Sequence, residues 1–125
     1  MNSHTNKEKA IAFLQLVASG QVQDAYKSYI NEDFRHHNPY FKGDRESLLL
    51  AMEESNVHSP DKVLEVKLAV QEKNIVTVFS HVKQKPEDIG GAVVHIFRFQ
   101  DDKIVEMWDV GQQIPQESPN TNGMF

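Results

Sequence analysis

Two ionisable residues stand out in the apolar stretch from Gly91 to Gly111, GAVVHIFRFQDDKIVEMWDVG. His95 and Asp109 are side chains of the types that carry acid/base chemistry. A carboxylate whose pKa is raised by an apolar setting is a better base near neutral pH, and a nearby imidazole can hydrogen-bond an enolate oxygen. The pair therefore suits removal of a proton next to a carbonyl group, provided that the two side chains meet.

Whether they meet depends on a β-hairpin, because successive side chains of a strand point to opposite faces. A two-residue turn at Asp101-Asp102 would send His95 and Asp109 to opposite faces. A three-residue turn that begins at Gln100 places them on one face, as diagonal neighbours about 7–8 Å apart at the backbone. This second register, which we predict, pairs His95 with Met107 and Val93 with Asp109. Its apolar face carries Val93, His95, Phe97, Phe99, Val105, Met107 and Asp109. The pair on it is either a structural ion pair or the working part of a pocket.

Composition limits the class of protein. The chain has 125 residues, a net charge of −5 and 39% apolar residues, as expected of one soluble globular domain. The acidic balance disfavours nucleic acid as a partner. No apolar run approaches the roughly 20 residues of a membrane span, and MNSHTNKEK lacks the apolar segment of a signal peptide. Without cysteine there is no disulfide or thiol catalysis. We expect no membrane partner, and a cytoplasmic location is compatible with the sequence.

Three helices are expected in the first half of the chain. Thr5 and Glu8 have capping-box spacing and open the first helix, and residues 22–29 form a second, short one. Asp44 is the expected N-cap of the third. Between the last two, residues 31–40 (NEDFRHHNPY) are too irregular for a helix.

The pattern then changes to the period of two that is typical of strands. Residues 63–71 and 75–84 are the expected strands before the hairpin, with a loop at 85–90. Three helices followed by four antiparallel strands predict an α+β domain. A strongly curved sheet wrapped around the helices would form a cone, and the His95/Asp109 face would line its open mouth. We place a single domain at residues 1–115 and a polar C-terminal tail at 116–125.

The helical first half, the segment HHNPYFKGDRESLL and the closing FRFQDDKIVEMWDV hairpin resemble the SnoaL-like members of the nuclear transport factor 2 (NTF2-like) superfamily. The resemblance runs from about Lys7 to Pro115. It implies the cone-shaped α+β fold. For the SnoaL-type cyclases it also implies an intramolecular aldol condensation without cofactor or metal. An aspartate near the end of the last long strand is then the acid/base, matching Asp109, and a histidine one strand earlier assists, matching His95.

Other residues are candidates for the pocket wall. The resemblance implies that a histidine of His37-Asn38-Pro39 faces the cavity, and we expect His37 rather than His36 to do so. His81 is a further polar candidate, whose face depends on the loop at 85–90. Tyr40 either closes the mouth or belongs to the core. The remaining expected lining residues are apolar: Phe97, Met107 and Val93. Three histidines and one aspartate could also bind a metal, but no compact spacing such as HExxH supports this, so we predict no metal and no cofactor.

The opposite face of the hairpin carries Trp108 beside Ile96, Ile104 and Val110. An apolar surface of this kind indicates a covered face. Family members often dimerise through this side of the sheet, so we predict a homodimer. The alternative is that helices of the same chain cover it.

Two classes of function follow. The first is an acid/base enzyme, an aldol-type polyketide cyclase or an isomerase, that acts on a small carbonyl compound through Asp109 and His95. The second is a non-catalytic protein that binds a small hydrophobic ligand in the same pocket. The superfamily contains both, so the resemblance alone does not decide between them.

Overall fold

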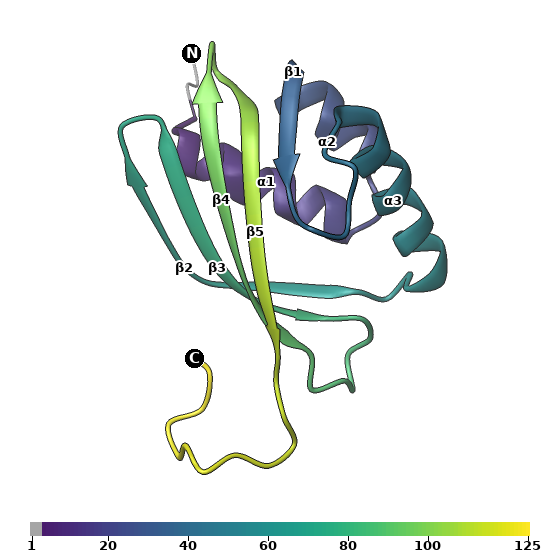
Figure 1. Ribbon diagram of the computed structural model, residues 1–125, viewed down its shortest axis with the longest axis vertical. Helices are drawn as coiled ribbons and strands as arrows, with labels where there is room; N and C mark the ends of the chain where they lie inside the picture. Colours follow the sequence, from purple (N-terminus) through teal and green to yellow (C-terminus); the bar gives the residue numbers. More distant parts are fainter. Residues whose placement is uncertain (1–3) are drawn as a thin grey trace.

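The computed structural model describes residues 4–125 and shows three helices on the concave side of a curved five-stranded sheet (Figure 1). The predicted α+β architecture is confirmed. In chain order the elements are α1 (Asn6–Ala18), α2 (Val22–Tyr29), β1 (Ile30–His37), α3 (Arg45–His58), β2 (Val63–Glu72), β3 (Ile75–Lys83), β4 (Gly91–Gln100) and β5 (Lys103–Gln113).

Local sequence signals set the helix starts. The capping box at α1 is formed as predicted: the Glu8 amide donates to the Thr5 hydroxyl at 3.1 Å, and the Thr5 amide donates to the Glu8 carboxylate at 2.9 Å. At α3 the carboxylate of Asp44 accepts from the Ser47 amide at 3.0 Å. Both helices are therefore fixed where they begin, which sets where their buried faces meet the sheet.

The segment expected to be irregular contains a fifth strand. β1 pairs in parallel with β5, so the sheet order is β1-β5-β4-β3-β2 and the sheet is mixed rather than wholly antiparallel. In β1, Phe34 and His36 are buried while Arg35 and His37 point to the other side. The sequence pattern does not reveal this strand because its residues are mostly polar and only half of its positions face the interior.

The three-residue hairpin turn expected from the sequence is wrong. Asp101 and Asp102 both have positive φ angles, 53° and 67°, and Gln100 pairs with Lys103 across them. This is a two-residue turn of the kind whose twist matches that of the flanking strands. Asp tolerates the left-handed conformation better than most residues, which is why the two aspartates serve here.

A β-bulge then changes the register. Past the turn, β5 carries one extra residue, Val105, that has no partner on β4. The shift by one residue returns His95 and Asp109 to the same face, where they are a directly opposed cross-strand pair. They share a face as predicted, but the expected pairings of His95 with Met107 and of Val93 with Asp109 are wrong.

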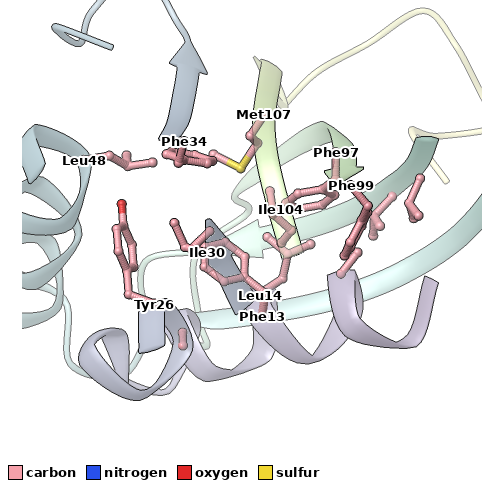
Figure 2. Packing of buried hydrophobic residues seen from close by; sticks show 14 of the residues in the cluster. Phe13, Leu14, Tyr26, Ile30, Phe34, Leu48, Phe97, Phe99, Ile104 and Met107 are labelled. Atoms are coloured by element: carbon pink, nitrogen blue, oxygen red, sulfur yellow. The ribbon is translucent and has the colours of Figure 1, made fainter. Parts of the chain in front are cut away.

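The core lies between the helices and the sheet, and Figure 2 shows the packing of its large side chains. The Phe13 ring of α1 lies edge-on to Phe97 of β4, with ring centroids 6.0 Å apart, and 6.3 Å from the Tyr26 ring of α2. Ile104, expected on the outer face, is fully buried there because the bulge reverses its direction. Since these large side chains fill the hairpin end of the sheet, the pocket between helices and sheet lies farther along β4 and β5, at Val93, His95 and Asp109.

Beyond β5 the tail is mostly exposed and runs back below the sheet (Figure 1). Its last residue, Phe125, lies on the outer face, with ring centroids 5.2 Å from Phe79 and 4.7 Å from His81. Within residues 4–125, no helix has the length and apolar character needed to cross a membrane.

Candidate active site

A pocket of about 230 Å³ opens between the helices and the sheet, beyond the packed core. It is smaller than the sites of about 300–1,000 Å³ that hold drug-sized molecules, so it suits a small ligand. Its wall is mainly apolar and comes from α1, α3, four strands and the segments before α3 and β2: Leu14, Val17, Ala18, Phe41, Leu48, Ala51, Met52, Ser55, Lys62, Leu64, Val82, Val93, His95 and Asp109.

Asp109 is held by two donors from β1 and the residues that follow it. Asn38 Nδ2 donates to Asp109 Oδ1 at 2.7 Å, and His36 Nε2 donates to the same oxygen at 3.3 Å. An ionised carboxylate only accepts hydrogen bonds, so the geometry assigns the Nε2 proton to His36. Both bonds fall on Oδ1, which leaves Oδ2 without a hydrogen bond from residues 4–125.

The pKa of Asp109 is lowered, whereas we expected it to be raised. Burial pulls this pKa up, but the hydrogen bonds from His36 and Asn38 to the carboxylate outweigh it and hold the pKa below its usual range. Asp109 is therefore ionised throughout the neutral range. The prediction that apolar surroundings would raise the pKa of Asp109 is wrong. The hydrogen bonds from His36 and Asn38 lower this pKa by more than burial raises it.

His95 lies across the strand pair from Asp109 with its ring stacked on Phe97, at 6.0 Å between centroids and 12° between planes. Its Nδ1 is buried and has no hydrogen-bond partner within residues 4–125. Burial lowers the pKa of His95 to about 4, against the opposing pull of the Asp109 carboxylate. At neutral pH the ring is therefore uncharged and still has hydrogen-bonding capacity to offer a ligand.

The two adjacent histidines are placed opposite to our expectation. His36 points inward with a fully buried side chain, 5.4 Å from the Phe41 ring at the pocket wall. His37 points to the outer face, stacks on Trp108 at 5.0 Å and donates from Nε2 to Glu106 Oε2 at 2.6 Å. The placement of His37 in the cavity is thus wrong, because β1 alternates and the inward parity belongs to His36.

Two further predicted wall residues lie elsewhere. His81 is on the outer face of β3, where its Nε2 lies 2.7 Å from the Ile89 carbonyl oxygen and its ring stacks on Phe125. Tyr40 is 90% exposed, so it does not belong to the core, and it does not line the pocket wall. Phe41, its neighbour, is the aromatic residue that reaches the pocket.

The apolar candidates divide between pocket and core. Val93 lines the pocket beside His95. Phe97 and Met107 face each other across β4 and β5 and are fully buried in the core. They do not line the pocket, although the Phe97 ring supports the stacked His95 ring.

Four polar residues of the site are not apparent from the sequence. His36 and Asn38 bind Asp109, and Ser55 of α3 and Lys62, just before β2, line the pocket. One sequence signal indicates His36. It lies two residues after Phe34, the large apolar residue of the segment, and in a strand two such residues point to the same face. Among residues 4–125 no three His, Cys, Asp or Glu side chains gather in a way that could hold a metal ion.

Comparison with protein families gives one match, in which the profile of the SnoaL-like domain covers residues 10–107. Comparison with curated protein sequences gives no significant match.

Several crystal structures share the fold. An uncharacterized cystatin-fold protein from Novosphingobium aromaticivorans superposes with a TM-score of 0.73 at 23% identity, over 86% of this chain and 99% of that one. AclR from Streptomyces galilaeus, described as a proposed hydroxylase, gives 0.73 at 23% identity, over 86% and 88%. IdmH from Streptomyces antibioticus, described as a proposed polyketide cyclase, gives 0.70 at 18% identity, over 87% and 93%. At these identities the likeness shows a common fold.

Proposed function

Because the chain belongs to the SnoaL-like domain family, we propose that it is a cofactor-independent acid/base enzyme acting on a small carbonyl compound, as an aldol-type cyclase or an isomerase. One observation carries the proposal. In a mainly apolar pocket, an ionised carboxylate lies directly across the strand pair from a neutral imidazole. One oxygen of this carboxylate accepts no hydrogen bond from residues 4–125.

Asp109 is the general base in this proposal. Its Oδ2 takes a proton from the carbon next to the substrate carbonyl, the C–H electron pair becomes the enolate double bond, and the carbonyl electrons move to oxygen. His95, neutral at pH 7, donates an N–H hydrogen bond to that oxygen. Delivery of the proton to a different carbon completes an isomerisation. Attack of the enolate carbon on a second carbonyl forms a carbon–carbon bond, and Asp109 then protonates the new alkoxide.

The low pKa of Asp109 narrows the substrate class. A weak base removes a proton at a useful rate only when the carbon acid is itself acidified. We therefore expect substrates whose reacting carbon lies between two carbonyl groups or is conjugated to one. The cavity of about 230 Å³ restricts these to small molecules or to one end of a longer one.

The second candidate is a non-catalytic ligand-binding protein, and one observation favours it. The bonds from His36 and Asn38 tie β1 and the turn after it to β5 through Asp109. A carboxylate used in this way stabilises the fold whether or not it acts on a substrate. The pocket would then bind a hydrophobic ligand and leave it unchanged.

A homodimer is part of the proposal. The helices pack on the concave side of the sheet, so they do not cover its outer face (Figure 1). That face presents exposed apolar side chains: Leu68 is 57% exposed, Val70 60% and Val110 69%. Together with Trp108 they form a surface that a second copy of the chain would bury. The proposed location is the cytoplasm.

Proton exchange tests the enzyme whatever its product is. A panel of small ketones and 1,3-diketones is incubated with the protein in deuterium oxide, and loss of the α-proton signal is followed by NMR. We expect accelerated exchange for the activated members and its loss in Asp109→Asn, which keeps the shape but removes the base. Asp101→Asn, in the exposed turn at a φ angle that Asn tolerates, is the matched control. Exchange retained in Asp109→Asn, or absent for the whole panel, would exclude the proposed role.

A further inference from the structure

A second polar group lines the pocket, away from Asp109. Lys62 Nζ donates to Ser55 Oγ at 2.6 Å, and both residues belong to the pocket wall. Lys62 comes just before β2, and Ser55 lies in the last part of α3. The half-buried ammonium group therefore faces a wall that is otherwise mainly apolar.

The charge of this lysine is not neutralised by its neighbours. Ser55, its hydrogen-bond partner, is uncharged, and no carboxylate of residues 4–125 pairs with it. Burial lowers the pKa of Lys62, and no ion pair with a carboxylate of residues 4–125 opposes the effect. A half-buried ammonium with one hydroxyl partner has two further N–H donors to offer, and these favour an anionic oxygen.

The two charged groups stand at opposite ends of the pocket. Lys62 belongs to the β2 edge of the wall and Asp109 to β5, with β3 and β4 between them. The register places Ala69 of β2 in line with Val78, His95 and Asp109, seven residues along the chain from Lys62, so the two charged groups are also offset along the strands. Between them the wall is apolar, built by Leu64, Val82 and Val93.

We propose that Lys62 and Ser55 bind the carboxylate of an elongated, mainly apolar keto acid, whose carbonyl end then lies between His95 and Asp109. The charge arrangement supports this orientation, because an anionic group is attracted to Lys62 and repelled by Asp109. The inference rests on the proposed function for the reacting end of the molecule. It deepens that function by naming the substrate class: a keto acid rather than a neutral ketone.

Binding of a matched pair of probes tests the anchor apart from the chemistry. Octanoate and octanamide have the same chain, but only the first is an anion. Their affinities are measured by calorimetry, and shifts of the Met52 and Leu64 methyl signals in NMR show whether they enter the pocket. A charge-assisted hydrogen bond of this kind gives a preference for octanoate of about ten- to a hundredfold.

The variants separate binding from structure. Lys62→Met keeps the length of the side chain and removes the charge, so we expect the preference for octanoate to disappear while octanamide binds as before. Lys27→Met, on the exposed side of α2, should leave the preference intact. Unchanged octanamide affinity also shows that Lys62→Met is folded. Equal affinities in the unmodified protein, no binding of octanoate in the pocket, or a preference retained in Lys62→Met would overturn the inference.

Asp109→Asn distinguishes the proposed general base from the proposed carboxylate site at Lys62 and Ser55. It should abolish proton exchange and retain the preference for octanoate, because the anchor lies at the other end of the pocket. If proton exchange survives this substitution while Lys62→Met loses the octanoate preference, the anchor stands and the assigned base is wrong. If exchange is lost but octanoate is never preferred, the base stands and the keto acid is wrong.

Discussion

The uncharged state of His95 has a measurable consequence for stability below neutral pH. In the folded protein burial lowers the pKa of His95 to about 4, whereas an unfolded histidine titrates near 6.5. Between these two values the unfolded chain binds a proton that the folded chain excludes. Stability must therefore fall as the pH falls through this window.

The size of the effect follows from the two pKa values. Each pH unit between them costs about 1.4 kcal/mol, so the loss attributable to His95 is about 2 kcal/mol at pH 5 and about 3 kcal/mol at pH 4. Asp109 acts in a different range. Its pKa is held below the usual 3.8, so the stability that it contributes is present above 3.8 and is lost only at lower pH. Comparisons between pH 7.5 and pH 5 therefore isolate the histidine.

The perturbation is His95→Gln, which keeps a polar side chain of similar length and removes the titration. Urea unfolding, followed by Trp108 fluorescence and far-ultraviolet circular dichroism, gives the free energy of unfolding of both proteins at several pH values. We expect the unmodified protein to lose about 2 kcal/mol more than the variant between pH 7.5 and pH 5. His58→Gln, at the exposed C-terminal end of α3, is the control that should leave the slope unchanged. Parallel slopes for His95→Gln and the unmodified protein, or an NMR titration of His95 centred at 6 or above, would refute the reasoning.

Two further predictions concern the neighbours of the pair and the outer face. Asn38→Ala removes the shorter of the two hydrogen bonds to Asp109, so the pKa of Asp109 should rise and the acid limb of the pH profile of proton exchange should move to higher pH. The free energy of unfolding in urea should fall by about 1 kcal/mol. An unchanged acid limb would show that this hydrogen bond does not lower the pKa of Asp109. Val110→Asp places a charge on the proposed dimer surface and should convert a particle of twice the 14.3 kDa chain mass into a monomer in light scattering, while Val57→Asp on α3 should not. A monomer at micromolar concentration before any substitution would contradict the dimer.

The hairpin shows how far the sequence alone can lead. Alternation identifies the two strands, and their apolar face correctly contains both His95 and Asp109. The predicted three-residue turn is wrong, because the turn has two residues. The one-residue change of register that places His95 and Asp109 on the same face comes from the bulge at Val105. A bulge without glycine leaves no mark in the sequence. The register depends on the packing of β5 between β1 and β4, and the sequence of the hairpin alone does not include β1.

The histidine pair in β1 illustrates a different limit. Adjacent residues of a strand must point apart, so the sequence shows that at most one of His36 and His37 enters the cavity. To choose between them, one must know that the segment is a strand and whether its even-numbered or odd-numbered residues point inward. The apolar Phe34 indicates that the even-numbered residues do. However, a mostly polar strand is recognised only when its pairing with β5 is known.

The chemistry of the site depends on contacts that no local pattern contains. The apolar neighbours of Asp109 along the hairpin argue for a raised pKa, yet donors about seventy positions earlier in the chain lower it. The same contacts that keep Asp109 ionised weaken it as a base. An enzyme built on this pair must therefore obtain its rate from enolate stabilisation by His95 and from the acidity of the substrate carbon. An anchor at Lys62 would help, because binding energy from the distant end of a keto acid can hold the carbonyl against these two groups.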